Sequence, residues 1–409
     1  MTMWNESTER PLPRVLLGFL FFGSLSCIPK PDPVIAEWGS VVPELRSTEL
    51  NGETLVDISD LLDIERSNSN LPALGGGMVI GDRVVAMGVS GTRKATGTKE
   101  VTLEDKWHIG SITKSITATL TASLIEDGIL SWDTTVTDVF QEPEIDPGWT
   151  DVRAIDLVRH LGGAPEPNMA ALFKGRMSEQ PAEAERRDWI FRDALLEPPR
   201  NRKFHYTNGN YILLGAMLEE LTQTPWQTLT RERIFEPLGL SSAGFGAPKD
   251  DQPWGHIPSE HSGPTPIFPG GLLADNPPVL GPAGTVHMSL YDLGRYAMEH
   301  LALYSGNSDV WQGEAFKRLY EIPENADRAY AGGWILDDDN PAVEGLLIHH
   351  NGSNSMWLAK VGFAPDRNMG FFCASNYFDK GKADVVCQNL FTHLANFAPI
   401  QEKFLEATP

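Results

Sequence analysis

The sequence predicts an α+β fold in which one antiparallel sheet is flanked by N- and C-terminal helices and joined to an all-helical lobe. Three observations predict it. A helical segment and a hairpin come first, a long helical section follows, and several short apolar strands precede a final amphipathic helix. Because helices and sheets bury their apolar faces against one another, this order favours one sheet packed by both ends of the chain.

The size and composition are those of a folded protein. The chain has 409 residues, of which 41% are hydrophobic and 22% charged, enough for a large core. The formal net charge of −22 repels phosphate backbones, so we expect no nucleic-acid partner. The charge does not identify a substrate, and a role in solubility explains it equally well.

Residues 1–27 have the pattern of a signal peptide or lipoprotein signal: arginines, the apolar run 15–22, and small residues just before Cys27. The apolar run is too short to span a membrane easily. We therefore expect export to the periplasm, either by simple cleavage or as a lipoprotein tethered to the membrane through Cys27. An uncleaved membrane anchor is the alternative.

The rest of the chain divides into a Pro-rich polar tether at 28–53, one large domain at 54–398 and a tail at 399–409. A helical insertion is expected at about 115–290 within that domain. The sequence contains no internal repeat.

The predicted elements follow in order. Residues 54–69 have apolar residues at helical spacing, and 78–89 hold two apolar runs around a Gly-Asp turn, which is typical of a hairpin. Residues 111–127 form the clearest helix, with one apolar face and Gly128 to end it. Further helices are expected at 211–221, 227–235 and 290–304, with long surface loops at 241–280.

Apolar runs that alternate with turns predict strands at 334–336, 346–348, 356–363 and 370–374, before a last helix at 380–397. Cys373 falls in a predicted strand and Cys387 in the last helix. A disulfide between them is one option, but we favour two separately buried thiols.

The strongest chemical signal is Ser111-Ile112-Thr113-Lys114, which opens a helix after the predicted strand 107–109. Side chains at i and i+3 share a helix face, so Lys114 would lie one turn from Ser111. A serine hydroxyl needs a base to become a nucleophile, and burial can lower the pKa of a lysine enough to serve. Ser-x-x-Lys alone is weak evidence, because Ser111 could equally be a plain helix cap.

A second candidate element is Tyr206-Thr207-Asn208. In an extended segment, Tyr206 and Asn208 would point to the same side. A phenol beside a lysine can relay a proton, and an amide can bind a substrate carbonyl. The alternative is a core tyrosine followed by a turn-forming asparagine.

The third candidate element is His350-Asn351-Gly352-Ser353, at the end of a predicted strand. Gly352 would let a substrate backbone approach closely. The N–H groups of Ser353 and Ser111 could together form an oxyanion hole. The stretch Lys360-Val361-Gly362 is a rival, but it lies in the middle of the next predicted strand.

These elements, in this order, resemble the β-lactamase-related serine hydrolases: class C β-lactamases, D-alanyl-D-alanine carboxypeptidases and esterase-like penicillin-binding proteins. The resemblance runs from about 71 to 394 and includes the stretches 156–160, 235–240, 281–292 and 332–334. It implies a cleft between the sheet and the helical lobe, within a catalytic domain at 54–398.

The resemblance also implies roles. Ser111 would be acylated, and Lys114 and Tyr206 would move the proton, with the choice of base left open. Asn208 and His350 would position substrate, and Gly352 and Ser353 would line the sheet side.

Two departures bear on the substrate. His350 stands where class C β-lactamases have Lys, and a largely neutral imidazole holds a β-lactam carboxylate less well. The usual Thr-Ser-Gly reads Leu161-Gly162-Gly163 here. We therefore expect hydrolysis of an amide or ester (a D-Ala peptide, a short ester or a β-lactam), with a carboxypeptidase or esterase favoured over a true β-lactamase.

No cofactor is expected, and no metal site either, because no metal-ligand spacing is present. The expected partner is a small-molecule or peptide substrate. The competing hypothesis is a non-enzymatic sensor or envelope-assembly protein that has kept the cleft.

Overall fold

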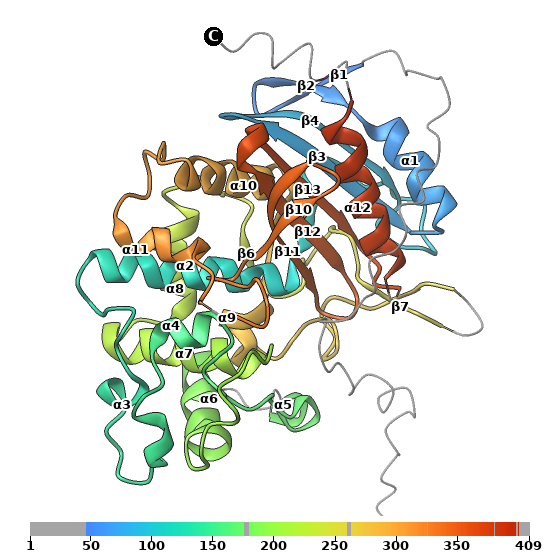
Figure 1. Cartoon of the computed structure of the whole chain (residues 1–409). Coiled ribbons are helices and arrows are strands. Elements are labelled where there is room, and N and C mark those ends of the chain that lie inside the picture. Colours follow the sequence, from blue (N-terminus) through green and yellow to red (C-terminus); the bar gives the residue numbers. More distant parts are fainter. Residues whose placement is uncertain are drawn as a thin grey trace, which may run out of the picture.

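The main sheet has eight strands in the order β1-β2-β4-β3-β13-β12-β11-β10 (Figure 1). The computed structural model describes residues 46–175, 180–259, 263–324, 326–379, 381–397 and 400. All neighbouring strands in this sheet are antiparallel except β2 and β4, which run parallel. The strands are β1 (Ser47–Leu50), β2 (Glu53–Asp57), β3 (Ala73–Ile80), β4 (Arg83–Gly91), β10 (Ile335–Asn340), β11 (Gly345–Ser353), β12 (Leu358–Ala364) and β13 (Met369–Ser375).

The beginning of the domain corrects the sequence prediction. The helix expected at 54–69 is only α1 (Ser59–Asn68), and β1 and β2 precede it as a hairpin. Asn51 and Gly52, both with positive φ, form the two-residue turn that such a hairpin favours. The turn at 51–52 and the pairing with β4 make residues 53–57 a strand, although their apolar spacing also fits a helix. The signal segment 1–27 lies outside the described residues.

The hairpin of β3 and β4 and the four C-terminal strands confirm the predicted sheet. Glycines in β3 let helices pack closely on both of its faces. A Cβ on Gly75 would lie 2.4 Å from Leu290 of α10 (Leu290–Tyr304), and one on Gly76 would lie 2.7 Å from Leu390 of α12 (Lys382–Ala395). Since those helices lie on opposite faces, β3 is the centre of a three-layer arrangement (Figure 1).

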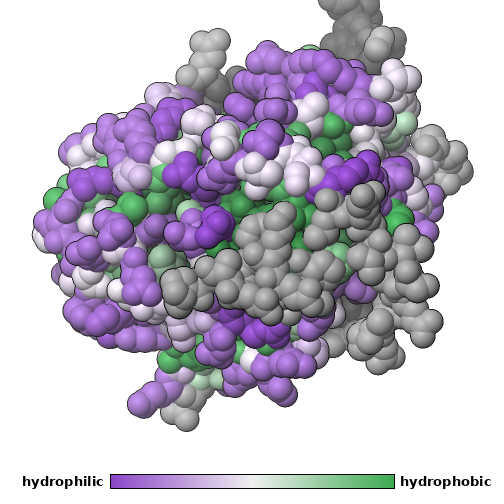
Figure 2. Space-filling view, turned by 90° about the horizontal axis from the view of Figure 1, so that it is seen from above, coloured by the Kyte–Doolittle hydropathy of each residue, from purple (hydrophilic) through white to green (hydrophobic). Residues whose placement is uncertain are grey.

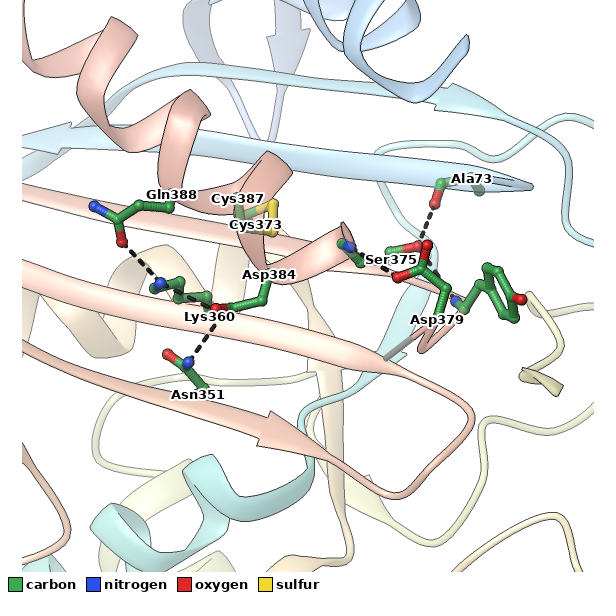
Figure 3. Close-up of a disulfide and its surroundings, with 11 residues drawn as sticks. Ala73, Asn351, Lys360, Cys373, Ser375, Asp379, Asp384, Cys387 and Gln388 are labelled. Carbon is green, nitrogen blue, oxygen red and sulfur yellow. Dashed lines mark hydrogen bonds and ion pairs between the residues drawn. A yellow bond between two sulfur atoms is a disulfide. The ribbon is translucent and has the colours of Figure 1, made fainter. Parts of the chain in front are cut away.

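One face of the sheet packs against α1 and α12 around a separate apolar core. Cys373 of β13 and Cys387 of α12 form a disulfide across this layer (Figure 3). The expectation of two separate thiols was therefore wrong. The packing of α12 on β13 brings the two cysteine side chains together, and the spacing of the residues in the sequence does not reveal that packing.

The other face packs against α10, α2 (Thr113–Glu126) and the helical lobe, which together hold the larger core. The predicted helix is confirmed, but α2 is buried on almost all sides and not along its apolar face alone. Hydroxyls replace apolar side chains there, as when Thr117 donates to the Pro282 carbonyl at 2.7 Å. The lobe's helices are α3 (Val136–Val139), α4 (Ala154–Val158), α5 (Met169–Gly175), α6 (Ala182–Trp189), α7 (Asn208–Thr222) and α8 (Trp226–Thr230).

A small sheet connects the layers, with β5 (Lys106–His108) and β6 (Gly244–Phe245) on either side of β9 (Val286–Ser289). In the described part of the predicted surface loops at 241–280, the regular elements are strand β6, the two-strand pair β7 (His256–Ile257) and β8 (Thr265–Pro266), and a short helical turn. Short helices α9 (Gly281–Gly284) and α11 (Glu314–Lys317) complete the fold.

Seen from above, the surface is mostly hydrophilic with smaller hydrophobic patches between (Figure 2). Within the described residues, the helices are all too short or too polar to cross a membrane.

Candidate active site

Ser111 lies in a tight 3₁₀ turn (Gly110–Ile112) between β5 and α2. Gly110 has a φ of +50°, and its N–H donates to Nδ1 of His108 at 3.1 Å. The Thr113 hydroxyl donates to the Gly110 carbonyl at 2.7 Å. Helix α2 begins without a side-chain cap, so Ser111 is not a plain helix cap. Its hydroxyl instead lies at the positive end of the α2 dipole.

Lys114 lies one turn along α2 and is completely buried. Its ammonium donates to the Ser111 hydroxyl at 3.0 Å, to Oδ1 of Asn208 at 2.9 Å and to the Ala283 carbonyl at 2.8 Å. All three acceptors are neutral. Burial therefore lowers the pKa of Lys114 to about 7, and the negative charge of Glu166 opposes that shift. Near neutral pH the amine is free to accept a proton in a large share of molecules.

Tyr206 comes from the segment before α7, and its hydroxyl oxygen is buried. The Lys114 ammonium lies 4.9 Å from the centre of the Tyr206 ring. Burial raises the pKa of Tyr206 well above its ordinary value, while the interaction with the Ser111 hydroxyl lowers it and the charge of Glu166 raises it. Tyr206 is therefore a neutral phenol at pH 7, next to the hydroxyl that Lys114 contacts.

Asn208 is the first residue of α7, where Thr207 caps the helix by accepting from the Gly209 N–H at 3.1 Å. The Asn208 side chain accepts from Lys114 through Oδ1 and donates through Nδ2 to Glu166 at 2.8 Å. The amide is thus fixed in one orientation. The Asn208 Nδ2 group, which was expected to donate to a substrate carbonyl, already gives one hydrogen bond to Glu166.

His350 lies on β11 and is buried. Its Nδ1 is 2.6 Å from the Asn351 carbonyl, and its Nε2 is 3.1 Å from the Tyr330 hydroxyl. A carbonyl only accepts, so Nδ1 carries the proton and Nε2 accepts from Tyr330. Burial, with the nearby charge of Lys114, lowers the pKa of His350 to about 3. The imidazole is neutral at pH 7, as the sequence analysis expected, and both ring nitrogens are engaged.

Gly352 and Ser353 form the end of β11, which packs against the turn that holds Ser111. A Cβ on Gly352 would lie 1.8 Å from the Ile109 carbonyl oxygen and 2.8 Å from the Ser111 nitrogen. A Cβ on Gly110 would lie 2.3 Å from the Ser353 nitrogen. The two glycines therefore let two backbones touch, with the Ser111 nitrogen next to Gly352 and the Ser353 nitrogen next to Gly110. The glycine at 352 is needed for this protein contact as well as for any approach of substrate.

The adjacent residues His349 and His350 alternate across the strand, so they lie on opposite faces of the sheet. The charge of Lys360 acts on His349 and that of Lys114 on His350, which fits this arrangement. Among the described residues no group of three or more His, Cys, Asp or Glu side chains could hold a metal ion.

The structure thus brings Ser111, Lys114, Tyr206, Asn208, His350, Gly352 and Ser353 to one place where the sheet meets the helical lobe. Sequence reasoning missed three participants: Glu166, Tyr330 and the carbonyl of Ala283. Two signals were available: the departure from the family pattern at 161–163, shortly before Glu166, and the family-like stretch 281–292, which contains Ala283.

Comparison with known proteins agrees with this architecture. Residues 66–389 match the family model described as Beta-lactamase, and the chain belongs to that family. Penicillin-binding protein 4 of Amycolatopsis lactamdurans is 29% identical over 212 residues, which cover 49% of this chain and 52% of that protein. The chain spans about half the length of the curated relatives it matches first, at 52%, 52% and 58%.

Two solved structures share the fold. An octameric penicillin-binding protein homologue from Pyrococcus abyssi aligns with a TM-score of 0.65 and 22% identity, covering 82% of this chain and 76% of that one. The D-amino acid amidase from Ochrobactrum anthropi SV3 aligns with a TM-score of 0.67 and 18% identity, covering 85% and 98%. The predicted fold class and family are therefore confirmed.

Proposed function

We propose that this protein is a serine hydrolase that cleaves an amide or ester through an acyl-serine intermediate on Ser111. One observation carries the proposal. The Lys114 ammonium contacts the Ser111 hydroxyl at 3.0 Å, and its complete burial lowers its pKa to about 7. A lysine with that pKa can deprotonate a serine at physiological pH.

In acylation, the neutral Lys114 amine takes the Ser111 proton as Oγ attacks the substrate carbonyl carbon. The resulting oxyanion accepts hydrogen bonds from the N–H groups of Ser111 and Ser353. The leaving amine or alcohol departs when the bond to the carbonyl carbon breaks, and it takes a proton passed on from Lys114. Tyr206, a neutral phenol beside the Ser111 hydroxyl, relays that proton.

In deacylation, water attacks the acyl carbon and gives its proton to Lys114 and Tyr206, the residues that move the proton in acylation. The Ser111–acyl bond breaks, Oγ regains a proton, and a free acid leaves. Lys114 is favoured over Tyr206 as the base because an unpaired lysine with a pKa of about 7 is half neutral at pH 7, whereas the Tyr206 pKa is raised.

The proposed substrates are a D-amino-acid amide or peptide, or a short ester. The D-amino acid amidase and the penicillin-binding proteins among the similar proteins support this substrate class. A true β-lactamase is less favoured, because the neutral His350 offers no positive charge to a β-lactam carboxylate.

Labelling with a fluorophosphonate tests the acyl-serine step. Intact-mass and peptide mass spectrometry should find the adduct on Ser111, and Ser111→Ala should remove both the adduct and turnover of D-alanine p-nitroanilide and p-nitrophenyl butyrate. Full turnover by Ser111→Ala would refute the mechanism. A folded wild-type protein that takes no label and turns over nothing would favour the sensor hypothesis.

We also propose that the protein is exported. The disulfide between Cys373 and Cys387 supports this, since disulfides persist in oxidising compartments. Fractionation of cells that make the full chain, with mass spectrometry of its N-terminus, would distinguish cleavage, lipidation of Cys27 and an uncleaved anchor. Recovery of the unprocessed chain in the cytoplasm would contradict export.

A further inference from the structure

The segment before Glu166 is fixed against the start of α7. The Ala164 N–H donates to Oδ1 of Asn210 at 3.1 Å. The Pro165 carbonyl oxygen would lie only 2.0 Å from a Cβ on Gly209, so a glycine there lets the segment lie directly on the helix. The position of Glu166 is therefore set by the fold and not by a free loop.

Glu166 presents a negative charge at the site while remaining exposed to solvent. Its two carboxylate oxygens accept from the Asn208 backbone N–H at 2.9 Å and from Asn208 Nδ2 at 2.8 Å. Each oxygen retains a second lone pair for another donor. Asn208 in turn contacts the Lys114 ammonium that contacts Ser111, so the carboxylate lies a short chain of hydrogen bonds from the reacting oxygen.

No other candidate site residue presents a positive charge to a substrate that would compensate the negative charge of Glu166. His350 is buried and neutral, and the three donor hydrogens of Lys114 are used by Ser111, Asn208 and Ala283. A substrate group that reaches Asn208 therefore meets an exposed carboxylate, with no candidate site cation pointing outward beside it.

We propose that Glu166 selects acyl donors with a primary ammonium group in the acyl part, such as amino-acid amides or esters with a free amine. The ammonium would pair with the carboxylate, and a carboxylate on the substrate at that place would be repelled. This inference rests on the proposed hydrolase function and deepens it by naming the charge of the preferred substrate.

Three p-nitroanilides test it: D-alanine with a free amine, its N-acetyl form and its N-succinyl form, which are cationic, neutral and anionic at pH 7. The expected order of kcat/KM is free amine, then acetyl, then succinyl. Glu166→Gln keeps the size and one acceptor oxygen, and it should reduce the ratio of free amine to acetyl by about fivefold, as for one solvent-exposed ion pair. High salt should reduce the wild-type ratio in the same direction.

Glu232→Gln is the matched control, because it removes the same charge from an exposed residue of the short helical turn that follows α8. It should leave all three rates unchanged. If Glu166→Gln lowers all three rates equally, Glu166 only positions Asn208 and the charge selection is overturned. An unchanged ratio overturns it as well. In both cases fluorophosphonate labelling of Ser111 still reports on the proposed function separately.

Discussion

Two buried lysines lie on opposite sides of the sheet, and their surroundings differ in one respect. Lys114, on the lobe side, contacts only neutral acceptors. Lys360 of β12, on the side of α12, lies 3.4 Å from the Asp384 carboxylate and donates to Gln388 at 2.8 Å (Figure 3). A buried cation that contacts no carboxylate is costly to fold, so the surroundings of Lys114 indicate chemistry, whereas the paired Lys360 indicates a structural role.

The largest expected effect comes from Lys114→Met, which keeps the length of the side chain and removes the amine. Loss of a general base should lower kcat/KM for D-alanine p-nitroanilide by about 10⁴-fold. The urea midpoint should change little, because a costly buried charge disappears together with its hydrogen bonds. A variant with more than a tenth of the wild-type activity would show that Lys114 is not the general base.

The next effect concerns the layer that contains Lys360. Replacing Cys373 and Cys387 together by Ala releases α12 from β13 and should lower the free energy of unfolding by about 3 kcal/mol, as for a loop of similar length. Urea denaturation measures this, with kcat/KM staying at the wild-type level. Reductant should destabilise the wild type but leave the double variant unaffected; equal sensitivity would show that the disulfide contributes nothing.

Lys360→Met should cost less, about 2 kcal/mol of unfolding free energy, because Asp384 keeps its hydrogen bond from Asn351. The acylation rate of Ser111 should not change. This variant is the counterpart of Lys114→Met, and the two should show opposite patterns of stability and activity. Loss of activity in Lys360→Met with unaltered stability would place Lys360 in the catalytic machinery after all.

The smallest effect is on pH dependence. The proposed mechanism requires the neutral form of Lys114, so kcat/KM should rise with pH through the pKa of about 7 and level off above it. One titrating group predicts an increase of about tenfold from about pH 6 to 8. The pH profile of Lys360→Met should coincide with that of the wild type. A rate that falls over this range would exclude neutral Lys114 as the base.

Sequence reasoning located what local spacing determines. Ser111 and Lys114 are one helical turn apart, and Tyr206 and Asn208 lie within three residues, so each pair is identifiable from the sequence alone. It could not supply what distant packing determines. The Cys373–Cys387 bond depends on how α12 lies on β13, and the hydrogen bond from Tyr330 to His350 depends on the path of a loop.

The same limit explains Glu166 and the N-terminal strands. A lone acidic residue in a loop has no distinguishing pattern, and the position of Glu166 is fixed by contacts of its segment with Asn208, Gly209 and Asn210. The apolar residues of β2 also fit the helical period of 3.6, so the sequence predicts a helix there, but pairing with β1 and β4 makes the segment a strand.

The backbone contact between Gly110 and Gly352 has a consequence for how the protein acquires activity. The two residues are separated by more than half of the chain, so the proposed oxyanion hole forms only when the last strands close onto a turn made much earlier. Closing so long a loop is slow compared with forming helices. During refolding, labelling of Ser111 should therefore recover after the far-ultraviolet helical signal, which makes the acylation rate a reporter of the final docking step.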